Sequence, residues 1–461
     1  MTLIKSISGI RGTIGGKPGE NLTPIDIVEC SAAFGQWISS KNKNGKIVIG
    51  RDGRISGNLV SNLVSQTLLA MGLDVIDLGL STTPTVEMAV LFHKADAGIV
   101  ITASHNPKQW NALKFLNQKG EFISKAEGEA LLEMINAGKL SFSPVNDLGE
   151  YTQDDSAIQE HIKSILDLEL IDTKAIEKKQ FKVVVDCVNS TGALSMAPLL
   201  EALNCECILL NADITGDFAH NPEPLPEHLV DLSKAVVEHK ADLGVAVDPD
   251  VDRLALVQED GMVFGEEYTL VAVADYILQY QKGSTVSNLS SSRALRDVSE
   301  KHGVKYHAAA VGEVNVVTCM KENKAAIGGE GNGGIIYPGL HYGRDALVGL
   351  GFILSYMAQS NLRASEIRAL YPQYFILKNK IQLTPDLDVD KLLEKLESKY
   401  SGEDISTVDG LKIDFEEGWI HLRKSNTEPI VRIYSEAKTK EIAQNLANQI
   451  QNDVDEILKN N

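Results

Sequence analysis

The sequence predicts three successive α/β regions followed by an α+β region. Two observations carry this prediction. A strand–helix–strand series occurs three times, and each series ends in a short apolar strand that runs into a polar loop. After about residue 373 the pattern changes to short strands alternating with turns. Self-similarity of this kind is typical of repeated copies of one α/β unit.

The first region places its elements by apolar spacing. Strands are expected at 46–50, 74–78 and 97–102, with a helix over 57–71. Apolar residues recur at helical intervals in that helix, namely Leu59, Val60, Leu63, Val64, Leu68 and Leu69. This period is typical of an amphipathic helix that covers a sheet.

The second and third regions repeat the same order. The second is expected to contain strands at 181–186, 205–210 and 242–247, with helices near 192–203 and 229–239. The third is expected to contain strands at 284–289 and 305–309 and helices at 293–302 and 313–322, and it ends in the loop Gly329–Asn332. Three similar α/β domains are the simplest interpretation.

The C-terminal region predicts an antiparallel sheet. Its strands are expected near 375–381, 411–415, 418–423 and 430–435, before an amphipathic helix over 438–457. The domain boundaries that follow are 1–152, 153–256, 257–371 and 372–461.

Composition limits the classes of partner. The 461 residues are 43% hydrophobic and 23% charged, as expected of a globular protein, and the formal charge is −19. Nucleic acid and acidic membrane surfaces are therefore poor partners, whereas a small molecule remains suitable. No basic-then-apolar leader and no membrane-length apolar run is present, so we expect a cytoplasmic protein. The sequence leaves its oligomeric state open.

The first candidate loop follows the strand that ends the first region. Ser104, His105, Asn106 and Pro107 come directly after an apolar run. Ligands of open α/β sheets bind at the carboxyl ends of strands, although Asn-Pro also occurs in plain turns. Adjacent side chains diverge, and no Gly-x-Ser-x-Gly elbow is present, so His105 is not expected to serve Ser104 as a hydrolase base. Carriage of phosphate on Ser104 fits better than acyl chemistry.

The second candidate loop carries Asp248, Asp250 and Asp252. Alternate carboxylates in an extended loop can converge on one hard cation. A calcium-binding EF-hand loop requires glycine at the sixth position, where Arg253 stands. A solvated acidic turn remains an alternative, as does a phosphatase that uses Asp248 as its nucleophile. Together with Ser104, the loop favours phosphoryl transfer assisted by a metal ion.

The third candidate loop, Gly329–Gly334, matches the dinucleotide pattern G-x-G-x-x-G only formally. No helix pattern follows it, and no acidic residue lies about twenty positions on, so we reject dinucleotide binding. Glu330 and Asn332 suit sugar hydroxyls, because the carboxylate accepts hydrogen bonds and the amide both donates and accepts them. A simple glycine-rich connection is the alternative.

The fourth candidate loop lies between two predicted strands and has arginines at both ends. Arg423 and Arg432 enclose a hydroxyl-rich turn that includes Ser425, Asn426 and Thr427. Forked guanidinium donors and backbone amides around one turn favour a phosphate.

Two further basic residues are candidates. Arg11 lies in the glycine-rich segment Gly9–Gly16, which is not a Walker loop, and it could reach a phosphate or lie in a surface turn. Lys114 follows Ser104 by ten residues and could neutralise a transferring phosphoryl group or relay a proton. A solvated lysine is the common alternative.

In their order, the four loops resemble those of the α-D-phosphohexomutase superfamily, and Gly9-Ile-Arg11-Gly12 matches as well. The resemblance spans the whole chain. It implies three similar α/β domains and a C-terminal α+β domain around a central cleft. The form Gly-Glu-Gly-Asn-Gly-Gly is similar to archaeal-type relatives that act on glucosamine, glucose or mannose phosphates. Two departures stand out: Gly333 and Gly334 follow where many relatives carry a histidine, and Ala112 stands where many have glycine.

The resemblance also implies roles for the candidate residues. Ser104 would carry the phosphate and, with Asp248, Asp250 and Asp252, would bind Mg²⁺. Arg11 and Arg253 would steady the transferring group, Lys114 would be the general acid or base, and His105 is counted among the catalytic candidates. Sugar hydroxyls would be bound by Glu330 and Asn332, and the other phosphate by Arg423, Ser425, Asn426, Thr427 and Arg432.

The expected reaction interconverts glucosamine 6-phosphate and glucosamine 1-phosphate through a phosphoserine and a 1,6-bisphosphate. A hexose 1,6-bisphosphate is the expected activator. The alternative within the superfamily is a phosphomannomutase/phosphoglucomutase, and a metal-dependent sugar phosphatase is the more distant one.

Overall fold

A computed structural model describes residues 1–6, 9–42, 45–382, 388–424 and 430–459. The chain forms two compact units. Unit 1 contains Met1–Gln281 and Asn332–Arg368, and unit 2 contains Lys282–Gly331 and Ala369–Asn461. Each unit is described on its own.

Unit 1 begins with a seven-stranded sheet of order β1-β2-β6-β5-β3-β4-β7. Its strands are β1 (Ile4–Ser6), β2 (Gly9–Thr13), β3 (Lys46–Arg51), β4 (Asp74–Leu80), β5 (Ala97–Ile101), β6 (Trp110–Leu116) and β7 (Tyr151–Gln153). Strands β3, β4, β5 and β7 pair in parallel, whereas β6 returns antiparallel to β5 and leads to β2 and β1. The carboxyl ends of β3 and β5 therefore meet at one edge.

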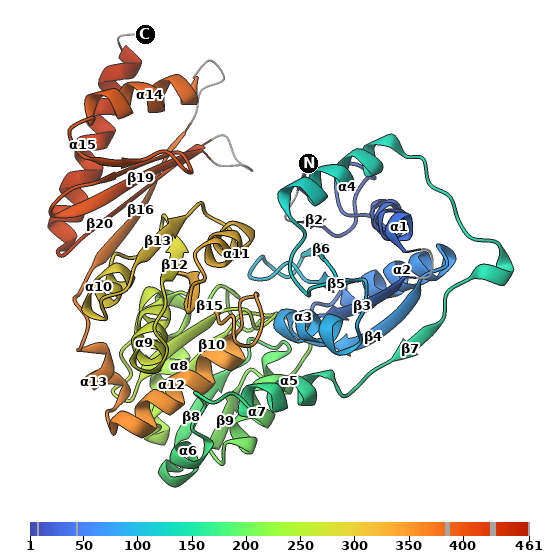
Figure 1. Ribbon diagram of the computed structural model, residues 1–461, viewed down its shortest axis with the longest axis horizontal. Coiled ribbons are helices and arrows are strands. Elements are labelled where there is room, and N and C mark those ends of the chain that lie inside the picture. The colour runs from blue at the N-terminus through green and yellow to red at the C-terminus, as the bar shows by residue number, and fades with distance from the viewer. Residues whose placement is uncertain (7–8, 43–44, 383–387, 425–429, 460–461) are drawn as a thin grey trace. The chain divides into compact units, whose positions relative to one another are not determined.

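Helices cover both faces of this sheet because apolar side chains alternate along buried strands. Ile47 and Ile49 pack with α1 (Pro24–Lys41) and α2 (Gly57–Ala70), while Val48 packs on the other face with α3 (Thr83–Phe92) (Figure 1). Helix α4 (Lys125–Ala137) contacts α1. Local sequence sets its ends: Ser124 and Glu127 form a capping box, and Gly138 ends the helix in a left-handed conformation.

The second sheet of unit 1 has the order β11-β10-β8-β9. Its strands are β8 (Lys182–Asp186), β9 (Glu206–Leu210), β10 (Leu243–Val247) and β11 (Leu254–Gln258), and only β11 runs antiparallel. Helix α8 (Val230–His239) packs against β8 and β10, and α7 (Gly192–Ala202) packs against β9. The remaining elements of the unit are α5 (Ala157–Leu166), α6 (Thr173–Lys179), α9 (Glu266–Tyr280), β15 (Gly334–Ile336), α12 (Ala346–Ser360), α13 (Ala364–Arg368) and the short 3₁₀ helices Val145–Asp147 and Pro226–His228.

Helix α12 is apolar around most of its circumference and is buried from Ala346 to Ala358. It packs against α5, α6 and α9. A helix with apolar residues on every side belongs in a protein interior, and this one joins later and earlier parts of the chain in one unit.

Unit 2 contains a parallel group and an antiparallel sheet. In the first, β12 (Thr285–Asn288) pairs with β13 (Tyr306–Ala309) and β14 (Ile327–Glu330), next to α10 (Ala294–Lys301) and α11 (Glu313–Glu322). The second has the order β16-β20-β19-β18-β17. Its elements are β16 (Phe375–Gln382), α14 (Val389–Lys399), β17 (Asp404–Ser406), β18 (Leu411–Asp414), β19 (Gly418–Lys424), β20 (Ile430–Ala437) and α15 (Lys440–Lys459).

The predicted three α/β regions and C-terminal α+β region are confirmed, with most predicted elements shifted by one to three residues. In each α/β region a candidate loop follows a parallel strand: β5, β10 or β14. The antiparallel strand β6 and helices α1 and α3 were not predicted.

Among the described helices, none combines the length and apolar character needed to cross a bilayer. The four domain boundaries stay predictions.

Candidate active site

Ser104 lies just beyond the carboxyl end of β5, as the sequence predicted. Only 8% of the residue is exposed. Its backbone has φ +49°, a left-handed conformation that is uncommon for residues other than glycine. The hydroxyl of Thr102 accepts a hydrogen bond from the Ser104 amide at 2.8 Å, which helps to hold this conformation.

A buried arginine holds the Ser104 loop through hydrogen bonds to its backbone. The guanidinium of Arg54, which follows β3, is 1% exposed and has five N–H donors to satisfy. Its Nε donates to Asp52 Oδ2 at 3.0 Å, and the same carboxylate oxygen accepts from the Thr102 hydroxyl at 2.6 Å. The terminal nitrogens donate to the carbonyl oxygens of Ser104, Asn106, Pro107 and Trp110. All five donors are therefore used, three of them on the loop and one on Trp110, the first residue of β6.

We expect Arg54→Leu to destabilise unit 1 by about 3–5 kcal/mol, because the substitution leaves Asp52 buried without its cation. A fall in the urea midpoint of unfolding would measure this effect. Arg51→Leu is the control, since Arg51 is only half-buried and makes one long contact, at 3.4 Å, to the Asp52 carbonyl. Equal midpoints for the two variants would contradict the role given to Arg54.

The three aspartates follow β10 and lie close together beside the hydroxyl of Ser104. Asp248, Asp250 and Asp252 are completely buried, and each offers a carboxylate oxygen within 4.8 Å of the others. Ser104 Oγ donates to Asp248 Oδ2 at 2.8 Å. The other oxygen of Asp248 accepts from the amides of Asp252 at 3.2 Å and Arg253 at 3.1 Å, which fixes the turn. The first two candidate loops thus form one site.

The aspartates fit a hard cation. Asp250 Oδ2 accepts from Thr83 Oγ1 at 2.6 Å and from Lys114 Nζ at 2.9 Å, and Asp252 Oδ2 accepts from Arg344 at 2.6 Å. The Oδ1 atoms of Asp250 and Asp252 are buried and accept no hydrogen bond from any residue that the structure describes. Carboxylate oxygens left over in this way are suitable ligands for Mg²⁺.

The electrostatics of the site are those of crowded charges. Burial raises the pKa of Asp248 well above its usual value, and repulsion from Asp252 and Asp250 adds to this effect. Burial acts in the same direction on Asp250, but Lys114 and Thr83 hold the pKa of Asp250 below its usual value. Burial alone would lower the pKa of Lys114, but attraction to Asp250 and Asp252 raises it. Lys114 is therefore an ammonium ion that can neutralise an incoming phosphate.

His105 is neutral and faces Arg253. Burial and the charge of Arg253 lower the pKa of His105 to about 2. The Arg253 guanidinium donates to His105 Nδ1 at 2.9 Å and also reaches Glu223 at 3.3 Å. Although His105 Nδ1 lies 3.3 Å from Ser104 Oγ, so weak a base is unsuited to remove a proton, and its contact instead orients Arg253.

Arg11 lies on the same face of the first sheet as Lys114. Strands β2 and β6 pair with Arg11 opposite Ala112, two residues before Lys114, and cross-strand neighbours project to one face. Burial lowers the pKa of Arg11. The structure thus brings Arg11 to the strand that carries Lys114, although the sequence distance between them is about a hundred residues.

The third candidate loop is divided between the units. In unit 2, Glu330 ends β14, and its Oε1 accepts from Asn288 at 2.9 Å and from the Gly312 amide at 3.2 Å. In unit 1, Asn332 Oδ1 accepts from the Gly334 amide at 3.2 Å. Gly333 lies between Asn332 and Gly334. Its φ is +84°, and a side chain there would collide with the carbonyl of Leu254. This close approach explains the glycine.

The fourth candidate loop belongs to a hairpin of unit 2. Arg423 on β19 lies directly opposite Arg432 on β20. Like charges in facing positions repel, so this arrangement favours an anion between or beside them. Arg423 Nε donates to Asp409 at 2.6 Å, which fixes its direction. Ser425, Asn426 and Thr427 lie outside the described residues.

Sequence reasoning missed the residues that support the site. Asp52 and Arg54 hold the serine loop, Thr83 binds Asp250, and Arg344 binds Asp252. One signal was available: the polar run Arg51-Asp52-Gly53-Arg54 directly follows a predicted strand, as the other candidate loops do. Thr83 and Arg344 carry no such signal.

Four models of the phosphoglucomutase/phosphomannomutase family match the chain in order. The α/β/α domain I model matches residues 3–141, domain II matches 159–261, domain III matches 265–374, and the C-terminal domain matches 377–452. Together they cover almost the whole length, including every candidate loop.

Similar proteins carry names from the same family. A phosphoglucomutase/phosphomannomutase of Thermococcus kodakarensis is 36% identical over 94% of this chain and 95% of that protein. A phosphoglucosamine/phosphogalactosamine mutase of Sulfurisphaera tokodaii is 32% identical over 96% of this chain and 97% of that protein. Among solved structures, a phosphoglucomutase/phosphomannomutase family protein of Burkholderia thailandensis is 26% identical, with a TM-score of 0.84 over 98% of this chain and 97% of that one.

Proposed function

Since the chain belongs to the phosphoglucomutase/phosphomannomutase family, whose members are isomerases that transfer phosphate, we propose that it is a phosphoglucosamine mutase. Its reaction would interconvert glucosamine 6-phosphate and glucosamine 1-phosphate. Ser104 would carry the phosphoryl group, and a 1,6-bisphosphate would be the intermediate.

The observation that carries the proposal is the contact between Ser104 and the aspartates. A serine hydroxyl that donates to Asp248 at 2.8 Å, inside a buried group of three carboxylates, combines a phosphate acceptor with a cation site. Phosphoryl transfer requires little covalent chemistry from a protein beyond positioning and charge stabilisation. The site provides both.

The proposed reaction consists of two phosphoryl transfers. From phosphorylated Ser104 the phosphoryl group passes to the free hydroxyl of the sugar monophosphate; the bond from phosphorus to Oγ breaks, a bond to the sugar oxygen forms, and the proton of that hydroxyl leaves while Oγ regains one. The phosphate that the substrate brought then passes to Ser104: its bond to the sugar oxygen breaks, a bond to Oγ forms, Oγ loses its proton and the sugar oxygen gains one. A hexose 1,6-bisphosphate added from outside would act as activator by phosphorylating Ser104.

The side chains around Ser104 would stabilise the charge that spreads over the transferring group. Lys114, already an ammonium ion, would donate to the phosphoryl oxygens and is the candidate for proton exchange. Arg253, oriented by His105, and Arg11 would add forked donors. When bound by Asp248, Asp250 and Asp252, Mg²⁺ would supply further neutralisation of the same charge.

Recognition of the sugar phosphate would rest on the other two loops. Glu330 and Asn332 would bind sugar hydroxyls, and Arg423 and Arg432 would bind the phosphate that is not reacting, with Ser425, Asn426 and Thr427. The cross-strand pairing of Arg423 and Arg432 supports this assignment.

Two names among the relatives give two candidate substrates. The phosphoglucosamine/phosphogalactosamine mutase of S. tokodaii supports an amino sugar. The name of the T. kodakarensis protein supports the alternative, a phosphomannomutase/phosphoglucomutase with the same mechanism.

We expect the highest kcat/KM with glucosamine 1-phosphate, compared with glucose 1-phosphate and mannose 1-phosphate. Each assay contains the matching 1,6-bisphosphate and Mg²⁺, and ³¹P NMR follows the 6-phosphate. Glucosamine carries an ammonium where glucose carries a hydroxyl. If the site forms a charged hydrogen bond to that ammonium, kcat/KM is expected to differ between the two sugars by at least about tenfold. A preference for glucose or mannose would keep the mechanism and favour the alternative substrate.

A further inference from the structure

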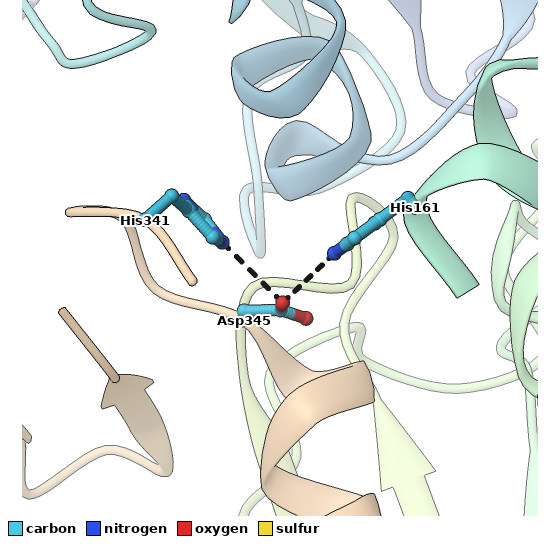
Figure 2. A group of neighbouring side chains, drawn as sticks. All are labelled: His161, His341 and Asp345. Carbon is cyan, nitrogen blue, oxygen red and sulfur yellow. Dashed lines mark hydrogen bonds and ion pairs between the residues drawn. The ribbon is translucent and has the colours of Figure 1, made fainter. Parts of the chain in front are cut away.

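A second group of buried metal-binding side chains lies in unit 1, apart from the three aspartates. His161 on α5, His341 in the loop after β15 and Asp345 at the start of α12 converge on one point (Figure 2). The exposed fractions are 0% for His161 and Asp345 and 6% for His341. Figure 2 shows both imidazoles directed at the same oxygen of Asp345.

Two of the three separations between the ligand atoms are close to those around a transition-metal ion, and all three atoms lie within 4.8 Å of one another. Asp345 Oδ2 lies 3.0 Å from His161 Nε2 and 3.3 Å from His341 Nε2. A tetrahedral ion with bonds of about 2.0–2.1 Å places its ligands roughly 3.3 Å apart. The three atoms could therefore bind an ion with small changes in side-chain torsions.

Asp345 and His161 each make a hydrogen bond through the other polar atom, and His341 Nδ1 faces a carboxylate. Asp345 Oδ1 accepts from the amides of Leu347 at 2.8 Å and Val348 at 3.2 Å. His341 Nδ1 lies 3.2 Å from a carboxylate oxygen of Glu87, and His161 Nδ1 lies 3.0 Å from Thr85 Oγ1. A carboxylate or hydroxyl behind each imidazole is the arrangement that orients histidine ligands of metals.

A divalent ion would suit the charge of the group. Asp345 and Glu87 are both buried carboxylates, and each lies within 3.3 Å of an imidazole nitrogen of His341. Without an ion, a proton shared between His341 and the carboxylates would be the competing occupant. The two occupants differ in a measurable way, because only one of them is a metal.

We propose that His161, His341 and Asp345 bind a divalent transition-metal ion of the zinc class. Two nitrogens and one oxygen favour zinc or cobalt over magnesium, which prefers the all-oxygen group of Asp248, Asp250 and Asp252. The ion would join α5, the start of α12 and, through Glu87, helix α3.

The position of this site gives it a structural consequence for the aspartate loop. The Ala346 amide, next to Asp345, donates to the carbonyl of Val251 at 3.3 Å, and Arg344 binds Asp252. An ion that fixes Asp345 would therefore also fix the backbone that supports the metal-binding aspartates. The proposal does not depend on which sugar phosphate the enzyme uses.

The test is the metal content of the untagged full-length protein and the visible spectrum of its Co²⁺ form. We expect about one equivalent of zinc-class metal after dialysis. After exchange for Co²⁺, we expect the visible absorption bands that a Co²⁺ ion of low coordination number gives. His161→Gln and His341→Gln should abolish both signals, and Glu87→Gln should weaken Co²⁺ binding by about 10–100-fold. Asp248→Asn should keep both, since Asp248 belongs to the other group of metal-binding side chains. His93→Gln should also keep both, since among its described contacts the His93 side chain pairs only with Asp154, in a part-buried position.

Three outcomes would overturn the proposal. The first is folded wild-type protein that retains no stoichiometric transition metal and gives no Co²⁺ bands. The second is a spectrum that both histidine variants leave unchanged, and the third is one that Asp248→Asn abolishes. Because the wild-type measurement alone can reject the site, the test holds even if a histidine variant fails to fold. None of these signals requires turnover, so they are separate from any failure of the proposed function.

Discussion

Ser104→Ala is expected to reduce turnover by about 10⁴-fold or more, because it removes the only atom proposed to carry the phosphoryl group. The same substitution should remove one phosphate from the intact protein. Intact-protein mass spectrometry before and after incubation with a hexose 1,6-bisphosphate measures the second effect, and the coupled mutase assay measures the first.

The control for this variant is Ser65→Ala. Ser65 is also buried, but it lies in α2 and its hydroxyl donates within the helix, to the carbonyl of Asn62. Full activity and full phosphorylation are expected there. A phosphatase that uses Asp248 as nucleophile would give a different pattern, because both Ser104→Ala and Ser65→Ala would then release phosphate from the sugar at the wild-type rate. A protein that binds sugar phosphates without turnover would show no activity in either variant.

Asp248→Asn is expected to lower kcat by about 100-fold or more, because it weakens both the cation site and the contact with Ser104. An excess of chelator should have the same effect on the wild-type enzyme, and added Mg²⁺ should restore wild-type activity alone. Ser104 would keep its hydrogen-bonding partner, since the asparagine amide can donate to Oγ in place of accepting from it.

The same substitution is expected to maintain or increase the stability of the folded protein when no Mg²⁺ is bound. The raised pKa of Asp248 means that its charged form costs stability in the folded protein, where it faces two other carboxylates. With chelator present, Asp248→Asn should therefore unfold at a temperature at least as high as the wild type. Mg²⁺ should raise the unfolding temperature of the wild type and change that of the variant little. A variant that is less stable in chelator, yet fully stabilised by Mg²⁺, would contradict the proposed ligand role.

The parts of the site that follow strands were predictable because a local pattern marks them. A short apolar run followed by polar residues identified Ser104 and Asp248: each follows a parallel strand at the carboxyl edge of its own sheet. Their meeting depends on how the two sheets of unit 1 pack together. The same reasoning identified Glu330. These residues depend on sequence neighbours, and sequence neighbours are visible without a structure.

Residues that act across long separations could not be found in this way. Thr83 binds Asp250 from the first residue of α3, and Arg344 binds Asp252 from a loop nearly a hundred positions later. His161 and His341 are separated by 180 positions, and although His341 stands four positions before Asp345, nothing in the sequence connects that pair with His161. Their meeting depends on how α5 and α12 pack, which is a property of the tertiary fold.

Three cations surround the three aspartates, and this balance links ion affinity to the state of Ser104. Lys114 contacts Asp250, Arg344 contacts Asp252, and Arg253 lies 3.9 Å from Asp248. The positive charges offset part of the charge of the three carboxylates, since Arg253 also contacts Glu223, and they reduce the net attraction for a divalent ion. A phosphate on Ser104 would add about two negative charges at the same place. Occupancy of the cation site would then follow the phosphorylation cycle by thermodynamic linkage, so that the ion is bound firmly while the carrier is loaded and exchanges readily once it is empty.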